Sequence, residues 1–186
     1  MIERIKNVKQ KSIVKQLFSL KRMKIIHSFD SVKTIGIVVD ITTEEDWKQL
    51  SNITKKFEKI GKKVYILARK NDKEKSDTKS NFIITDTNVL ILHTKTDFNF
   101  WGMPKPFTLK SFFDRKYDIL IDMTPNNGDF FPIYVALHAL SDLRISRSND
   151  DDENKKIYDL LLKMSPNDSN CDFLEQVVRY LNMVNK

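Results

Sequence analysis

Polar residues follow two runs of the chain that have the composition of buried strands, and such residues could serve as a general base or bind a metal or a hydroxyl group. Asp40 ends one β-branched apolar run, and Asp122 ends another, with Asn126 and Asn127 shortly after it. Ligands of parallel α/β sheets bind beyond the carboxyl ends of the strands. We therefore expect a ligand crevice at these residues. The alternative for both acids is capping of a loop or helix through backbone N–H groups.

An aromatic loop over residues 97–106 is a second candidate for ligand contact. Two prolines and a glycine keep it out of a helix. Trp101 could stack on a base or a sugar, and Lys105 could hold a phosphate. The alternative is that the rings of Phe98, Phe100 and Trp101 fasten the loop to the core.

No spacing in the chain matches a known catalytic or cofactor motif. GxGxxG, GxxxxGK[ST] and GxSxG are absent. His27, His93 and His138 are far apart in the sequence, and the single Cys171 has no cysteine partner. The sequence therefore predicts no metal and no cofactor, and it favours a non-enzymatic protein. We expect His138 to be packed within a helix and Cys171 to be unreactive.

The net charge of +7 belongs entirely to the N-terminal segment. Residues 1–26 carry eight cationic side chains and one acid, and the remainder holds 24 of each sign. A basic chain ordinarily suggests nucleic-acid binding, but here the globular part is neutral. We expect any charged partner of this segment to be anionic. Its cationic residues are Arg4, Lys6, Lys9, Lys11, Lys15, Lys21, Arg22 and Lys24.

The same segment has the pattern of an amphipathic helix that is too charged to span a membrane. Four roles are open for it. The apolar face could pack on the domain, lie in the headgroup layer of an anionic membrane, or enter a groove of a partner protein, or the lysines could neutralise RNA or DNA phosphates. The residues that form the apolar face are Ile2, Ile5, Ile13, Leu17, Leu20 and Met23.

Beyond residue 26 the chain alternates between short β-branched runs and amphipathic helices. The pattern predicts a single three-layer α/β domain over residues 27–186, with a largely parallel five- or six-stranded sheet, preceded by the basic helix over residues 1–26. Residues 69–80 contain no apolar side chain, and we expect them to form a solvated loop. One cysteine and no long apolar run indicate a cytoplasmic protein, or one peripheral to the inner membrane. The expected strands lie near residues 32–41, 64–68, 89–93, 117–123, 143–146 and 157–163.

Several stretches resemble a known family. TIGIVVD from residue 34, FNFWGMPK from residue 98, YDILID from residue 117 and IYDLLL from residue 157 look like segments of a family of small uncharacterised proteins of Bacteroidetes-type bacteria. Residues 117–146 are also similar to the middle of the amino-terminal half of heptosyltransferase-like glycosyltransferases. The family resemblance implies an α/β fold and a cytoplasmic setting, and no activity.

Two functions are consistent with these features. The preferred one is a non-catalytic α/β adaptor whose basic helix attaches it to an anionic surface, either a membrane face or an RNA-containing assembly. The alternative is a protein or enzyme that binds a nucleotide or a sugar phosphate in the strand-end crevice. A protein partner is also open, and the oligomeric state is not predicted.

Overall fold

The chain forms a six-stranded sheet with helices on both faces. The computed structural model describes residues 2–18, 22–70, 87–125, 129–148, 156–165 and 168–184. All strands pair in parallel, in the order β3-β2-β1-β4-β5-β6. The predicted three-layer α/β fold is confirmed. The elements are α1 (Ile2–Phe18), β1 (Thr34–Ile41), α2 (Glu44–Lys59), β2 (Lys63–Lys70), β3 (Val89–His93), α3 (Lys110–Phe113), β4 (Lys116–Asp122), α4 (Phe130–His138), β5 (Leu140–Ser148), β6 (Leu160–Lys163) and α5 (Asn170–Met183).

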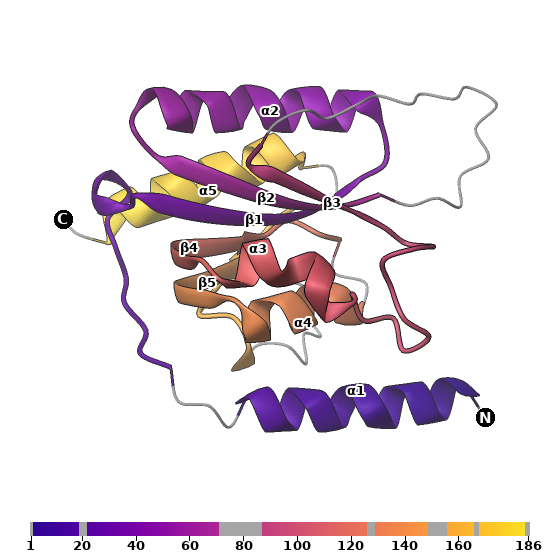
Figure 1. The fold of residues 1–186 in the computed structure, drawn as a ribbon. Helices are drawn as coiled ribbons and strands as arrows, with labels where there is room; N and C mark the ends of the chain where they lie inside the picture. Colours follow the sequence, from indigo (N-terminus) through magenta and orange to yellow (C-terminus); the bar gives the residue numbers. More distant parts are fainter. Residues whose placement is uncertain are drawn as a thin grey trace.

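Helices α2 and α5 cover one face of the sheet, and α1, α3 and α4 lie on the other (Figure 1). Thr43 caps the start of helix α2: its hydroxyl accepts from the backbone N–H of Asp46, and the Asp46 carboxylate accepts from the backbone N–H of Thr43. This reciprocal cap satisfies two backbone donors that the first helical turn leaves free. Leu50 and Phe57 then pack on the sheet at helical spacing.

The second face of the sheet is organised around Tyr117 at the start of β4. The Tyr117 ring is fully buried, and its hydroxyl donates to the carbonyl of Phe112 at 2.8 Å. Gly36 in β1 makes room for this ring. A Cβ on Gly36 would lie 3.0 Å from the Tyr117 ring and 2.9 Å from a Leu120 methyl group, so a larger residue would overpack the centre of the sheet.

Helix α1 packs against the domain through one face. Ile13, Val14 and Leu17 contact the apolar cluster beneath α4. Of the apolar face predicted from the sequence, Ile13 and Leu17 are therefore packed, whereas Ile5 is 52% exposed and Met23 is 79% exposed. The helix ends at Phe18, and residues 22–27 form no helix.

Most strand positions agree with the prediction, and the boundaries differ at every strand except β3. The last strand begins at Leu160 rather than at residue 157, and β5 runs over Leu140–Ser148 rather than residues 143–146. Strand β2 extends to Lys70, so Arg69 lies in the sheet and not in a solvated loop as the sequence predicted. Across the described residues, no helix combines the length and apolar character needed to cross a bilayer.

Candidate ligand-binding site at the strand ends

A cavity of about 540 Å³ opens beside the carboxyl ends of β1 and β2. The chain leaves β1 toward β2 and β3 on one side and later returns to place β4 on the other side of β1. The crevice at such a reversal of strand order is where open α/β sheets bind ligands. Asp40 and Thr42 line the cavity from β1 and the turn after it, Arg69 from β2, and Asp129 from the start of α4. The aromatic loop and α1 complete its wall.

Arg69 links the two carboxylates of the cavity. Its Nε and NH2 donate to the two oxygens of Asp40 at 2.7 and 2.6 Å, and NH1 donates to Asp129. The guanidinium also lies 4.8 Å from the centroid of the Phe131 ring. Burial would lower the pKa of Arg69, but the two aspartates outweigh it and raise the pKa. Arg69 therefore stays charged and holds both carboxylates in place.

Lys6 brings a further cation to the cavity from α1. Its Nζ lies beside Gly102, where a Cβ would be only 3.1 Å away, and Gly102 has a φ of +74° that favours glycine. Among the described residues, no hydrogen-bond or ion-pair partner is found for Lys6. Gln10, one turn further along α1, donates to the carbonyl of Trp101 at 2.9 Å. The helix is thus fastened to the aromatic loop, with the Lys6 amine at the cavity.

Of the crevice residues predicted from the sequence, some line the cavity and others do not. Asp40 lines the cavity. Trp101 is half-buried with its ring edge-to-face against Phe100 at 5.3 Å, and Lys105 donates to the carbonyl of Thr96 at 2.6 Å. Neither is among the residues that line the cavity. Asn126 and Asn127 lie outside the described residues, so their predicted role stays a prediction.

Asp122 is buried beneath the sheet end and does not line the cavity. One carboxylate oxygen accepts from the backbone N–H and the hydroxyl of Thr124 at 2.9 and 2.7 Å. The other accepts from the hydroxyls of Tyr158 and Ser146. Burial raises the pKa of the Asp122 carboxyl, although these hydrogen bonds oppose the rise. The geometry corresponds to the capping alternative, with the carboxylate tying β4, β5 and Tyr158 together.

The sequence pattern places Arg69 in a loop and Lys6 only within a basic segment. A signal for Arg69 was present, because Asp40 and Arg69 are directly opposite in the register of β1 and β2. Extending the predicted strand over residues 64–68 by one residue places these opposite charges side by side. No signal in the sequence places Lys6, because its position depends on how α1 docks.

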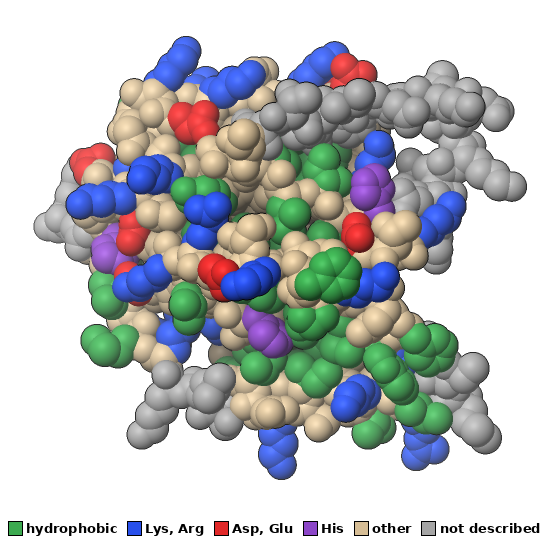
Figure 2. Space-filling model, in the orientation of Figure 1, with side chains coloured by type: hydrophobic (Ala, Val, Ile, Leu, Met, Phe, Trp, Pro, Cys, Tyr) green, Lys and Arg blue, Asp and Glu red, His purple; other side chains and the backbone are tan. Residues whose placement is uncertain are grey.

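The eight cations of the N-terminal segment lie in different surroundings. Lys6 faces the cavity, Arg22 and Lys24 pair with Asp159, and Lys21 lies outside the described residues. The remaining four side chains are exposed on α1, and lysine and arginine side chains project from the molecule in that region (Figure 2). These four are Arg4, Lys9, Lys11 and Lys15.

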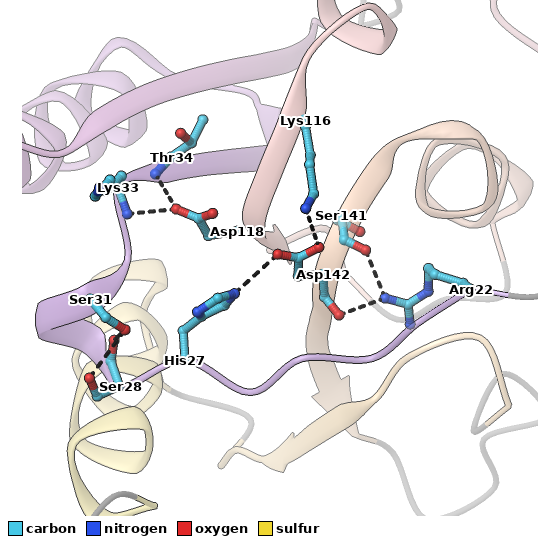
Figure 3. A network of polar contacts seen from close by, with 10 residues as sticks. All are labelled: Arg22, His27, Ser28, Ser31, Lys33, Thr34, Lys116, Asp118, Ser141 and Asp142. Atoms are coloured by element: carbon cyan, nitrogen blue, oxygen red, sulfur yellow. Dashed lines mark hydrogen bonds and ion pairs between the residues drawn. The ribbon is translucent and has the colours of Figure 1, made fainter.

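A polar cluster holds residues 22–27 against the amino ends of β4 and β5 (Figure 3). His27 contacts the Asp142 carboxylate at 3.1 Å, and Lys116 contacts its other oxygen at 2.9 Å. The ligand atoms of His27, Asp118 and Asp142 lie within 4.8 Å of one another and could hold a metal ion. Asp118, however, already accepts from two backbone N–H groups at the start of β1, and Asp142 is paired with Lys116. The carboxylates of the cluster are therefore already paired within the protein. Their role is to anchor the N-terminal segment to the sheet.

The carboxylates of this anchor are held in their charged form. Burial would raise the pKa of Asp159, but hydrogen bonds from Arg22, from the backbone N–H of Arg144 and from Lys24 outweigh it and lower the pKa. The same balance lowers the pKa of Asp142. A carboxyl group whose pKa is lowered by folding stabilises the folded contacts at any pH above 3.8, its ordinary pKa. This stabilisation is lost as the pH falls through the lowered pKa.

Acidification below pH 3.8 should therefore release residues 22–27 from the sheet. The backbone N–H of Ile25 reports on this release, because it donates to the carbonyl of Asp142 at 3.2 Å. We expect its hydrogen-exchange protection to fall with pH while the amides of β1 stay protected, and Arg22→Ala to lower it already at neutral pH. If the hydrogen-exchange protection of the Ile25 amide changes with pH in the same way as that of the β1 amides, residues 22–27 are not released separately. That result would contradict this prediction.

His138 and Cys171 are placed as the sequence predicts. The His138 ring stacks on Phe113 at 5.5 Å and contacts the carbonyl of Tyr134 at 2.9 Å, which is a packed position within the α4 surface. Burial and the nearby charges of Asp172 and Glu175 raise the pKa of the Cys171 thiol. A raised pKa leaves less thiolate at neutral pH, which is in line with the low reactivity predicted for Cys171.

The comparison with protein families identifies where the chain belongs. The model of DUF6913, a family of unknown function, matches residues 6–184. The chain belongs to this family. No curated protein matches the chain, and no solved structure matches it. The expected membership of a family without an established activity is confirmed, and the bacterial origin and the likeness to heptosyltransferase-like enzymes stay predictions.

Proposed function

We propose that the protein binds a small phosphorylated ligand, a nucleotide or a sugar phosphate, in the strand-end cavity. The observation that carries this proposal is the Lys6 amine at a cavity on the ligand-binding side of the sheet, where no described residue forms a hydrogen bond or an ion pair with it. A cavity of about 540 Å³ is within the range of small-molecule sites. Arg69 adds no free positive charge there, because it pairs with two carboxylates, and the four charged residues of the lining together are neutral.

The rest of the cavity fits the two parts of such a ligand. The phosphate would pair with Lys6 through charge-assisted hydrogen bonds. The rings of Phe98 and Phe100 line the wall, and Phe98 is itself held edge-to-face against Phe131 at 5.5 Å. Phe100 is 67% exposed, which leaves its ring free to cover a base or a sugar. Asp40, a carboxylate at the end of β1, could accept a hydrogen bond from a sugar hydroxyl.

Thermal unfolding of the full chain with a panel of nucleotides and sugar phosphates tests this function. At least one compound should raise the melting temperature. Lys6→Ala should weaken its binding about tenfold or more, since a hydrogen bond to a charged group contributes about 1.5–3 kcal/mol. Lys9→Ala is the matched control, because Lys9 lies on the same helix and is exposed. No stabilisation across the panel, or equal losses in the two variants, would refute the proposal.

A second function is favoured by the exposed surface of α1. Arg4, Lys9, Lys11 and Lys15 remain exposed around Val8, which is itself 64% exposed. Such a face could attach the domain to an anionic membrane or an RNA-containing assembly, as the adaptor hypothesis holds. Binding to anionic vesicles and to RNA should then fall steeply with salt and should be lost when these four residues are replaced by glutamine. Binding that the replacement leaves unchanged would exclude this role.

A further inference from the structure

A second cavity, of about 590 Å³, lies at the amino ends of β4 and β5, away from the strand-end cavity. The end of α1 forms part of its wall through Leu17 and Phe18, and Met23 follows from the segment after the helix. Leu140, the first residue of β5, lies on the opposite side. Phe18, Met23 and Leu140 are each at least half exposed, so the apolar wall is open to solvent. An apolar wall of this kind suits the hydrocarbon part of a ligand.

The charged residues of this cavity carry an excess of positive charge. Five cationic side chains line it against two carboxylates, which leaves three positive charges over. Both carboxylates are already used, because Asp159 pairs with Arg22 and Lys24, and Asp142 pairs with Lys116 and His27. The excess therefore has no counter-charge among the residues that line the cavity.

Arg144 is the cationic residue of this cavity whose side chain is buried and, among the described residues, keeps an unpaired hydrogen-bond donor. It is only 8% exposed, and its Nε is buried without a hydrogen-bond partner in the part of the chain that the structure describes. Asp159 accepts a hydrogen bond from the backbone N–H of Arg144 at 2.9 Å, but it directs its ion pairs to Arg22 and Lys24. Burial, with the nearby charge of Arg22, lowers the pKa of Arg144 to about 10.

A buried Nε without a hydrogen-bond partner is unfavourable, because its lost hydration is not replaced, and the charge of Asp159 compensates the guanidinium only in part. The carboxylate or phosphate group of a ligand in the cavity would add an acceptor for the guanidinium, since the planar fork of arginine matches both groups. Lys156 also lines the cavity and is exposed. It could hold a second oxygen of the same group.

We propose that this cavity binds a small amphiphilic anion, with its carboxylate or phosphate group at Arg144 and its hydrocarbon chain against Phe18, Met23 and Leu140. The site is independent of the strand-end cavity, because the two share no residue. Helix α1 lines both, through Lys6 near its start and through Leu17 and Phe18 at its end.

Calorimetric titration of the full chain with four probes tests this site and identifies the acidic group. Octanoate and octyl phosphate carry the two possible acidic groups, octanol lacks the charge, and inorganic phosphate lacks the hydrocarbon chain. We expect at least one of the first two to bind, at least tenfold more tightly than either octanol or inorganic phosphate. Stronger binding of octanoate or of octyl phosphate names the preferred group. Failure of both to bind would overturn the proposal.

Substitutions at Arg144 locate the binding. Arg144→Met should weaken binding of the preferred probe tenfold or more. It should also raise the melting temperature of the free protein, because it removes a charged group whose Nε is buried without a hydrogen-bond partner among the described residues. Arg179→Met is the matched control, since Arg179 is exposed on α5. If Arg144→Met fails to fold, Leu140→Asp, which places a carboxylate at the rim, should weaken binding more than Leu140→Asn. Unchanged binding of the probe to Arg144→Met would overturn the proposal, and so would equal binding to Leu140→Asp and Leu140→Asn. Lys6→Ala, which alters the strand-end cavity, should have no effect on binding of this probe.

Discussion

Replacing Asp122 with alanine should lower the free energy of unfolding by roughly 2–4 kcal/mol, because it removes the shared acceptor of several buried donors and leaves a small void. The Asp122 carboxylate is only 4% exposed and accepts from Thr124, Tyr158 and Ser146. Urea unfolding of the variant measures the loss. Asp114→Ala is a suitable control, since the Asp114 carboxylate is 61% exposed and pairs with Lys110 on the surface. Equal effects of the two substitutions would contradict the structural role of Asp122.

Asp122→Asn should be much milder and should change the dependence of stability on pH. Burial raises the pKa of the Asp122 carboxyl above 3.8, so the folded state keeps this proton to higher pH than the unfolded state. The contribution of this group therefore favours folding at low pH and declines as the pH rises through the raised pKa. The asparagine variant lacks this decline. The difference in stability between the variant and the natural chain should accordingly shift in favour of the variant as the pH rises from 3.8.

Arg69→Met should destabilise the fold by about 2 kcal/mol, below the range for fully buried ion pairs, because its partners keep some solvent contact. The side chains of Arg69, Asp40 and Asp129 are 15%, 21% and 29% exposed. Without the guanidinium, the two carboxylates would repel each other across the cavity, and Phe131 would lose its cation. Urea unfolding measures this change.

A second substitution distinguishes charge repulsion from lost packing. Adding Asp40→Asn to Arg69→Met should recover part of the lost stability, since it removes one of the two facing carboxylates. Arg69→Lys should lie between the natural chain and Arg69→Met, because lysine keeps the charge but lacks the planar fork. Asp40→Asn alone measures how much this substitution lowers the free energy of unfolding in the natural chain. If it lowers the free energy of unfolding of Arg69→Met by the same amount, the ion pairs contribute nothing to stability. That result would contradict the role given to Arg69.

The fold could be predicted from the sequence because its strands carry a strong signal. Ile35, Ile37 and Val39 point into one apolar cluster and Val38 into the other, so β1 is apolar on both faces, as a central parallel strand must be. The order of the strands could not be predicted. It depends on which edges the crossovers reach, and the sequence of each strand does not encode that choice.

The candidate site was predicted only in part. Asp40 was found because it ends a clear strand, whereas Arg69 was assigned to a loop because it begins a run without apolar residues. The side chain of Asp122 satisfied the same rule as that of Asp40 but is buried against Tyr158. Strand-end position therefore identifies candidates, and long-range packing by Tyr158 and α1 decides which of them face the cavity.

The most direct test of ligand binding at the strand ends is an NMR titration of the ¹⁵N-labelled full chain with ADP and with ribose 5-phosphate. Thr42, Asn99 and Gly102 surround the cavity. We expect their amide signals to shift as at least one of the two ligands is added, until the site is saturated. Lys6→Ala should reduce these shifts at equal ligand concentration, and Lys9→Ala should not. Shifts confined to the exposed face of α1 or to the amino ends of β4 and β5, or no shift with either ligand, would contradict ligand binding at the strand ends.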